Sequence, residues 1–281
     1  MSLDDLYIVS VIPARSGSKG VANKNLRKLN GIELLKWSIK ASLQTKVISR
    51  TLVSTDSDEY AQIANEMGAE APFLRPESIS RDNSTDLEMI LHSINFFKSE
   101  GRIPDLIVHL RPTSPLRNPN VVSQAIKLSA NNLDNISAVR SIQEMSETAY
   151  KSFEIGENGN LISVFTHSND LDKSNLNRQS FPKTFVANGY VDVLIPSYIL
   201  KESKIHGDKV LPFVTENILE IDTESDLKQL ESMREFTSDY YKLIFWRIKW
   251  QALCFQENQW PLSPFKQLIE LLKHQFLPQE L

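Results

Sequence analysis

Short apolar runs rich in β-branched residues alternate along this chain with segments of helical periodicity, and this alternation constrains the fold most. Each run is too short for a helix and is typical of a buried strand. The expected strands are residues 7–13, 50–55, 105–110 and 136–139. The expected helices, each with apolar residues along one side, are residues 33–43, 58–67, 86–98 and 120–130. The pattern predicts a doubly wound α/β fold, with helices on both faces of a mostly parallel sheet and right-handed crossovers.

Three loops directly follow expected strands. They are residues 14–25, 54–58 and 111–118. Open α/β sheets bind their ligands beyond the carboxyl ends of the strands. We therefore expect functional residues of the first half of the chain in these loops.

The second half of the chain has a different pattern. A turn signal at residues 156–159 separates two short apolar segments and predicts a β-hairpin. Its strands are expected at residues 150–155 and 161–166. The remaining expected elements are strands at residues 185–195 and 216–222 and a helix at residues 224–234 capped by Thr223.

The last segment, residues 235–281, holds three of the four tryptophans, and we expect a separate helical appendage there. Within it, residues 240–250 are apolar nearly all round, with three cations and no acid. Such a segment either packs onto a protein surface or rests on a membrane surface, and we favour packing.

Composition limits the classes of function. A content of 41% hydrophobic and 23% charged residues is typical of a folded domain. The net charge of −4 does not favour nucleic-acid binding, so an anionic substrate needs locally placed cations. The single cysteine, Cys254, excludes a disulfide within the chain. Residues 1–5 lack the basic start of a signal peptide and no apolar run suits a membrane span, so we expect a cytoplasmic protein.

The loop after the first expected strand is both glycine-containing and basic. Gly17 and Gly20 allow backbone amides to turn toward an anion. Arg15, Lys19 and Lys24 add three cations within ten residues, which suits a nucleoside triphosphate. The loop has neither the G-x-x-x-x-G-K-[ST] nor the G-x-G-x-x-G pattern. Composition alone leaves two interpretations, a phosphate-binding loop or a solvated basic turn.

The order of residues in this loop is more specific. Ile12-Pro-Ala-Arg-Ser-Gly-Ser-Lys-Gly20, followed by Lys24-Asn25, resembles the opening signature of the CMP-sialic acid synthetases, also called acylneuraminate cytidylyltransferases. Further similar segments follow in the family's order. They are Ser54–Ser57, Arg75 to His92, Leu110–Arg117, Arg178 to Gly189 and Ile221 to Leu227. Together the similar segments span about residues 7–232.

The resemblance implies a reaction. The anomeric hydroxyl of a sialic-acid-like nine-carbon 2-keto sugar acid attacks the α-phosphorus of CTP, and pyrophosphate leaves. The resemblance further implies Mg²⁺ as cofactor, which Mn²⁺ can replace, and a homodimer. It implies a nucleotidyltransferase domain of residues 1–234 with a dimerisation and sugar-site insertion at about residues 148–185. CTP and the sugar acid are the implied partners; neither nucleic acid nor stable membrane insertion is implied.

Site residues are carried over from the matching segments. The implied catalytic residues are Arg15, Lys24 and Asp222. The implied nucleotide-binding residues are Ala14, Arg15, Ser18, Lys24, Asn25, Arg75 and Ser84. The implied sugar-binding residues are Arg111, Thr113, Ser114, Arg178, Phe185 and Asn188. Asp222 and Glu220 are the implied metal ligands, and on a strand residues i and i+2 face the same way, so both could reach one Mg²⁺.

Several alternatives remain open. Arg111 stands where sialic-acid members of the family have glutamine, and its guanidinium can bind a carboxylate through two hydrogen bonds. The sugar can therefore also be legionaminic, pseudaminic or 3-deoxy-octulosonic acid, with GTP as an alternative donor. A catalytically silent nucleotide- or sugar-binding member is a further alternative. Asp82 is equally expected as a helix-start acid, and His92 as a packed helix histidine.

Overall fold

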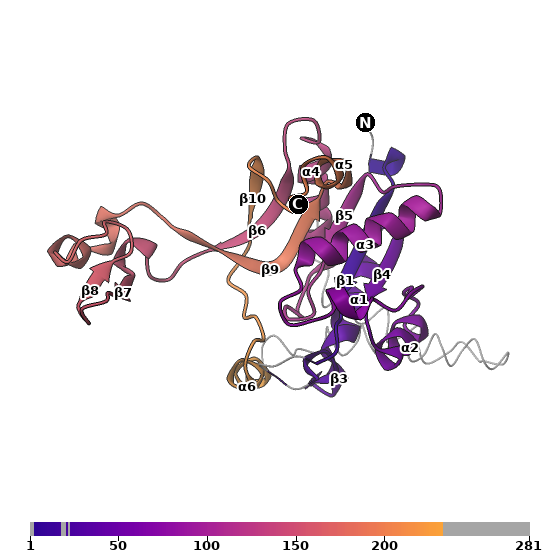
Figure 1. Ribbon diagram of the computed structural model, residues 1–281, viewed down its shortest axis with the longest axis horizontal. Coiled ribbons are helices and arrows are strands. Elements are labelled where there is room, and N and C mark those ends of the chain that lie inside the picture. The colour runs from indigo at the N-terminus through magenta and orange to yellow at the C-terminus, as the bar shows by residue number, and fades with distance from the viewer. Residues whose placement is uncertain (1–2, 18–20, 22, 233–281) are drawn as a thin grey trace, which may run out of the picture. The chain divides into compact units, whose positions relative to one another are not determined.

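The computed structural model describes residues 3–17, 21 and 23–232 (Figure 1). The chain divides into two units, Met1–Ser232 and Met233–Leu281, and the described residues all belong to the first. A six-stranded sheet forms its centre, in the order β10-β6-β9-β5-β1-β4. These strands are β1 (Ile8–Pro13), β4 (Arg50–Ser54), β5 (Leu106–His109), β6 (Ala138–Glu144), β9 (Phe185–Leu194) and β10 (Val210–Val214).

Most neighbouring strands of this sheet are parallel. β1 pairs in parallel with both β4 and β5, and β6 pairs in parallel with β10. Strand β9 lies between β5 and β6 and is antiparallel to both. The predicted mostly parallel α/β fold is therefore confirmed, with one antiparallel strand that joins its two parallel groups.

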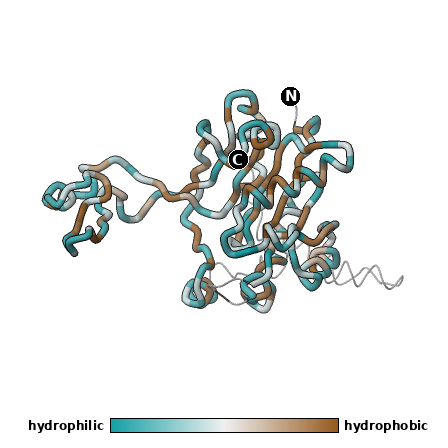
Figure 2. The backbone as a smooth tube through the Cα atoms, viewed as in Figure 1, coloured by the Kyte–Doolittle hydropathy of each residue, from teal (hydrophilic) through white to brown (hydrophobic). Residues whose placement is uncertain are grey.

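Helices cover both faces of the sheet. The helices α1 (Leu34–Gln44), α2 (Asp58–Glu66) and α4 (Pro119–Ala130) contribute to one buried hydrophobic cluster. The helices α3 (Asp86–Ser99) and α5 (Pro196–Glu202) contribute to the other. Alternate residues of β1 divide between the clusters, with Ile8 and Ile12 in the first and Val9 and Val11 in the second. Figure 2 shows the hydrophobic segments along the strands of this sheet.

Local signals start these helices where the sequence indicates. The Ser57 side chain accepts a hydrogen bond from the Tyr60 amide and caps α2. Thr85 and Glu88 form a reciprocal capping box at the start of α3. These caps fix where the loops before α2 and α3 end, and both loops contribute to the site described below.

The prediction of a strand at residues 216–222 is wrong. The last strand of the sheet is instead Val210–Val214, and residues 215–222 form no regular element. Pro212 lies within this strand and weakened its signal in the sequence. A proline lacks the N–H that a central strand needs, but β10 lies at the edge of the sheet, where proline is tolerated.

Three other short elements were not expected. They are α5 and a small antiparallel pair, β2 (Lys28–Leu29) and β3 (Ile32–Glu33). The helix expected at residues 224–234 is present as α6 (Glu224–Ser232), and Thr223 Oγ1 accepts a hydrogen bond from the Asp226 amide at its start. The expected appendage, residues 235–281, lies outside the described residues, as does the end of that predicted helix.

An arm formed by residues 145–184 connects the end of β6 to the start of β9. It carries the predicted hairpin, which is present as β7 (Phe153–Ile155) and β8 (Leu161–Ser163). Tyr150 packs against Phe165 and Phe181 with ring-centroid distances of 4.1 and 5.7 Å. Figure 1 shows the hairpin beyond the ends of β6 and β9, away from the helices that cover the sheet.

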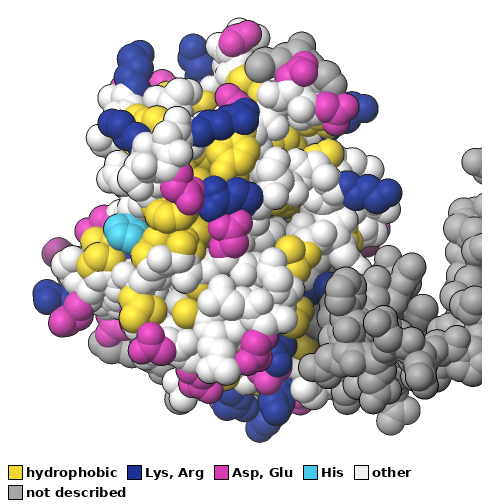
Figure 3. Space-filling view, turned by 90° about the vertical axis from the view of Figure 1, so that its right-hand side faces the viewer, with side chains coloured by type: hydrophobic (Ala, Val, Ile, Leu, Met, Phe, Trp, Pro, Cys, Tyr) yellow, Lys and Arg dark blue, Asp and Glu magenta, His cyan; other side chains and the backbone are white. Residues whose placement is uncertain are grey.

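The surface mixes charges of both signs. On the face shown in Figure 3, Lys and Arg side chains are interspersed with Asp and Glu, and hydrophobic side chains lie between them. Within the part of the chain that the structure describes, no helix has both the length and the apolar composition that crossing a membrane requires.

Candidate active site

A cavity of about 430 Å³ opens where β1 and β5 end, at the carboxyl edge of the parallel strands. Its walls come from the loop after β1, the segment before α3 and the loop after β5. The lining residues are Pro13, Arg15, Lys24, Asn25, Arg75, Asp82, Ser84, Thr85, Asp86, Arg111, Pro112 and Thr113. The structure therefore brings together predicted residues from three of the matching segments.

The loop after β1 is fixed at both ends. The Ser16 amide and hydroxyl both donate to the Asp56 carboxylate, at 2.7 and 2.9 Å. The Asn25 side-chain amide donates to the Arg15 carbonyl at 3.1 Å, so it joins the two sides of the loop. Gly17 has a φ of 71°, a left-handed conformation that glycine adopts without strain. Ser18 and Lys19, which were expected to contribute here, lie outside the described residues.

The two expected phosphate-binding cations are each paired with a partly exposed carboxylate. Arg15 Nη1 lies 3.0 Å from Asp82 Oδ1. Lys24 Nζ lies 2.9 Å from Asp222 Oδ1, and the Asp222 side chain is 69% exposed. Exposed pairs of this kind contribute little to stability, about 0–1 kcal/mol. A polyphosphate entering the cavity can therefore compete for both cations.

Arg75 is held differently. It is buried, and its Nη2 donates to the Ser54 carbonyl at the end of β4 at 2.7 Å. Burial lowers its pKa, and the neighbouring Arg15 acts in the same direction. Ser84 is placed by a turn in which its hydroxyl accepts from the Arg81 amide at 2.9 Å. Both residues reach the cavity from fixed backbone.

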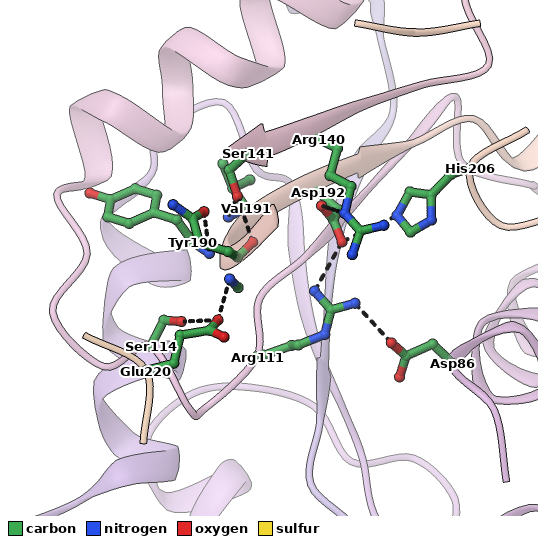
Figure 4. Close-up of polar contacts among 12 residues, drawn as sticks. Asp86, Arg111, Ser114, Arg140, Ser141, Tyr190, Val191, Asp192, His206 and Glu220 are labelled. Carbon is green, nitrogen blue, oxygen red and sulfur yellow. Dashed lines mark hydrogen bonds and ion pairs between the residues drawn. The ribbon is translucent and has the colours of Figure 1, made fainter. Parts of the chain in front are cut away.

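A charge network centred on the buried Asp192 forms a second wall (Figure 4). Arg111 directly follows Leu110 after β5, and its Nη2 donates to Asp86 Oδ2 at 2.8 Å. Its Nη1 donates to Asp192 Oδ2 at 2.9 Å, and the Asp192 side chain is 0% exposed. His206 Nε2 lies 3.3 Å from the same Asp192 oxygen, and Arg140 Nε lies 3.8 Å from the other. Arg111 therefore reaches the cavity with two carboxylates already bound.

The pKa values follow from this arrangement. Burial opposes ionisation of Asp192, but the His206 hydrogen bond and the Arg111 charge outweigh it and hold the pKa at about 2. His109 lies opposite Asp192 in the pairing of β5 with β9 and is completely buried. Burial, reinforced by Arg111, lowers its pKa to about 4. The wall thus keeps Asp192 charged and His109 neutral at neutral pH.

A family model described as cytidylyltransferase matches residues 9–248. The chain belongs to this cytidylyltransferase family. The N-acylneuraminate cytidylyltransferase of Escherichia coli O18:K1:H7 is 31% identical to it over 223 residues, which are 79% of this chain and 50% of that protein. The chain thus spans about half the length of that relative.

Two further similarities bear on family and fold. The CMP-N,N'-diacetyllegionaminic acid synthase of Legionella pneumophila is 28% identical over 245 residues, covering 83% of this chain and 99% of that one. A solved structure of CMP:2-keto-3-deoxy-manno-octonic acid synthetase with CTP has a TM-score of 0.60 to this chain at 14% identity. That match covers 82% of this chain and 99% of the other, and it shows the fold alone.

Some of the expected site residues lie outside the cavity wall. Ala14 is buried in the core. Asn188 is also buried, and its side-chain amide donates to Gln143 Oε1 and Thr215 Oγ1. The Ser114 hydroxyl donates to Glu220 Oε1 at 3.1 Å. These contacts give the three residues packing or positioning roles in the described structure.

Of two expected sugar-site residues, one lies on the arm and the other directly follows it. The Arg178 side chain is 58% exposed and lies 3.5 Å from Glu144 Oε1. Phe185 is exposed at the first position of β9. Neither lines the cavity. Their contact with a sugar stays a prediction.

The geometric reason for pairing Glu220 with Asp222 is wrong, because residues 215–222 form no strand. Glu220 is instead turned toward β9, where its Oε1 accepts a hydrogen bond from the Gly189 amide. Asp222 is turned toward Lys24. Among the described residues, no three His, Cys, Asp or Glu side chains are grouped closely enough to hold a metal ion by themselves.

Sequence reasoning assigned no role to two residues at or beside the cavity. Asp86, the first residue of α3, lines the cavity and binds Arg111. Arg117 is buried, and its Nη2 donates to the carbonyls of Arg111 and Gly189, both at 2.6 Å. Burial lowers the Arg117 pKa to about 9. The signal for Arg117 was its place as the last residue of the matching segment Leu110–Arg117.

Proposed function

We propose that the chain activates a sialic-acid-like nine-carbon 2-keto sugar acid with CTP, giving the CMP-sugar and pyrophosphate. The observation that carries the proposal is the convergence of Arg15, Lys24 and Arg75 on one cavity at the carboxyl edge of the sheet. Arg15 and Lys24 suit the triphosphate of a nucleotide, whose charge must be neutralised before a nucleophile approaches phosphorus, and Arg75 suits its nucleoside part. The names of the relatives from Escherichia coli and Legionella pneumophila support a sugar acid as the second substrate.

In the proposed reaction, the anomeric hydroxyl oxygen forms a bond to the α-phosphorus of CTP. The bond between that phosphorus and the bridging β-phosphate oxygen breaks, its electron pair stays with pyrophosphate, and the hydroxyl proton passes to water. Arg15 and Lys24 hold the triphosphate and neutralise charge on the leaving group. Arg75 and Ser84, on the neighbouring wall, hold the nucleoside part. The chemistry rests on positioning and charge rather than on a covalent intermediate with the protein.

We propose Mg²⁺ as cofactor, with Mn²⁺ as a substitute. The residues fit, because the exposed Asp222 carboxylate lies against Lys24, which lines the cavity. Mg²⁺ prefers hard oxygen ligands and usually keeps several waters, so one protein carboxylate with phosphate oxygens is sufficient. When bound, the ion would supply further neutralisation of phosphate charge.

Asp222→Asn keeps the shape of this side chain and removes its charge. We expect turnover to fall by about tenfold or more, with a higher Mg²⁺ concentration needed for half-maximal activity. Glu231→Gln, which removes an exposed charge from the following helix α6, is the matched control. Equal effects of the two substitutions on Mg²⁺ dependence would contradict the assignment of Asp222.

The choice of substrates is tested by pyrophosphate release. The assay should pair each of the four nucleoside triphosphates with N-acetylneuraminic, legionaminic, pseudaminic and 3-deoxy-octulosonic acids. We expect release with CTP and a nine-carbon acid. The similarity to the legionaminic acid synthase over nearly its whole length favours legionaminic acid as the second candidate. Release with GTP only would replace the proposal with the GTP-dependent alternative. No release with any pair of substrates would replace it with the catalytically silent alternative.

We also propose that the chain is a homodimer held by the arm, in the cytoplasm. The hairpin exposes apolar side chains, among them Ile155 at 76% exposure and Phe165 at 60%. An apolar surface on a projecting arm is well suited to covering by a second copy of the same chain. The paired substitution Ile155→Lys and Phe165→Lys should convert the dimer to a monomer in light scattering. An unchanged mass would remove the arm from the interface.

A further inference from the structure

The pairing of β9 with β6 is interrupted beside the cavity. Arg140 lies opposite Asp192, but the next pair is Ile142 with Ala187, so residues 188–191 of β9 face only Ser141. A bulge of this kind leaves backbone groups without partners in the ladder. Each such group that is buried needs another hydrogen bond.

Side chains supply those hydrogen bonds. The Ser141 hydroxyl donates to the Asn188 carbonyl at 3.0 Å and accepts from the Val191 amide at 2.9 Å. Arg117 donates to the Gly189 carbonyl. The Gly189 amide donates to Glu220 Oε1 (Figure 4 shows this contact below β9). Glu220 is therefore the partner of one backbone N–H at the bulge.

The same glutamate oxygen also holds the loop after β5. Glu220 Oε1 accepts from the Ser114 hydroxyl at 3.1 Å, and the next amide, that of Ile221, donates to the Thr113 carbonyl at 2.8 Å. Thr113 lines the cavity. Through one oxygen, Glu220 thus joins the bulge to a loop of the cavity wall.

The contact explains the glycine at the bulge. A Cβ at position 189 would lie 2.1 Å from Glu220 Oε1 and 2.9 Å from Ser114 Oγ. Both distances are shorter than real carbon contacts, so any other residue would displace the Glu220 carboxylate. The close approach of Gly189 and Glu220 is therefore a built feature of the site.

We propose that Glu220 is a positioning residue, which holds the bulge of β9 and the Thr113–Ser114 loop in place, and is not a metal ligand. Its effect on turnover rests on the proposed function; its structural role does not. Both hydrogen bonds end on one oxygen, so glutamine, which keeps a carbonyl oxygen there, can accept both. A metal ligand would instead need the negative charge. Glu220→Gln should therefore preserve function if Glu220 is a positioning residue and impair it if Glu220 is a metal ligand.

The first experiment follows the Gly189 amide by hydrogen exchange in the full chain. Glu220→Ala should speed its exchange by about tenfold or more, as expected from loss of one hydrogen bond, while Glu220→Gln should leave it near the original rate. Ser114→Ala, which removes the second contact only, is the matched control and should change Gly189 exchange less than Glu220→Ala. Unchanged exchange in a folded Glu220→Ala protein would overturn the proposal whether or not the chain is an active enzyme.

The second experiment measures Mn²⁺ binding by electron paramagnetic resonance in the presence of CTP and without sugar acid. We expect Glu220→Gln to keep the Mn²⁺ affinity and the turnover within about twofold, and Asp222→Asn to weaken Mn²⁺ binding. If Glu220→Ala does not fold, the Mn²⁺ affinity and turnover of Glu220→Gln alone test the proposal. A loss of Mn²⁺ affinity in Glu220→Gln equal to that in Asp222→Asn would restore Glu220 as a metal ligand and overturn the proposal.

Discussion

Arg15 and Lys24, on one wall of the cavity, each pair with a single, partly exposed carboxylate, whereas Arg111, on the second wall, pairs with Asp192, which is completely buried. The two walls differ in the free energy of unfolding that is lost when one partner of an ion pair is removed. An exposed pair contributes about 0–1 kcal/mol, and water replaces a lost partner. Breaking a buried pair leaves a charge without solvent and costs about 3–5 kcal/mol.

This contrast indicates that the two walls have different roles. The cations of the loop after β1 can exchange their carboxylates for an incoming phosphate group, because little free energy opposes the exchange. The wall formed by β5 and β9 holds its charges permanently and so keeps a fixed shape beside the substrate. Mutations on the first wall should therefore affect turnover, and mutations on the second should affect folding first.

The largest expected effect is on stability, in Arg111→Met. This substitution keeps much of the side-chain volume but leaves Asp192 buried beside fewer cations, so we expect a loss of about 3–5 kcal/mol in the free energy of unfolding. Urea unfolding measures it. Arg178→Met, which removes an exposed arginine from its contact with Glu144, is the control and should change stability by less than about 1 kcal/mol. Equal stability of the two variants would break the comparison between the walls.

The next effect is on turnover, in Arg15→Ala. Loss of a charged contact to the leaving phosphates should lower turnover by a factor on the order of 10² or more, about 3 kcal/mol. The unfolding free energy should change by less than about 1 kcal/mol, because the pair with Asp82 is partly exposed. Arg81→Ala is the matched control, since Arg81 pairs with Glu77 and does not line the cavity. Near-normal pyrophosphate release by a folded Arg15→Ala protein would remove this loop from the site.

The first wall could be predicted from the sequence, and the second only in part. Arg15, Lys24 and Asn25 follow a strand whose apolar run is unambiguous, so their place at the carboxyl edge was foreseeable. Arg111 was expected to face a substrate carboxylate. Its two observed carboxylate partners lie 25 and 81 residues away in the chain.

Long-range contacts explain the other differences. Arg117 donates hydrogen bonds to backbone carbonyls, including that of Gly189, 72 positions away. Because every residue has such a carbonyl, the sequence does not indicate which ones Arg117 contacts. Glu220 was paired with Asp222 because a strand was expected there, and Pro212 concealed the true strand just before it. Local pattern therefore predicted most of the helices and strands and the place of the loop after β1. It could not predict which distant groups close the bulge.

The smallest effect is a pH dependence of stability that comes from His109. Its pKa of about 4 in the folded chain lies below the ordinary value of about 6.5, chiefly because the ring is buried, and Arg111 adds to the shift. The charges that face it are Arg111, Asp86, Asp192 and His206. Neither ring nitrogen has a hydrogen-bond partner among the described residues, so a proton on the folded ring would gain no compensating bond.

The sign of this pH effect follows from proton uptake by the two states. Between pH 6.5 and 4 the unfolded chain binds a proton at His109 that the folded chain does not, so stability is complete above about pH 6.5 and falls as the pH falls. At pH 5.5 the loss should be about 1 kcal/mol. Urea unfolding between pH 7.5 and 5 should show this slope, and His109→Asn should lose that part of it, while His167→Asn, at an exposed position on the arm, should keep it. An unchanged slope in His109→Asn would mean that water reaches the ring, and the second wall would then be no drier than the first.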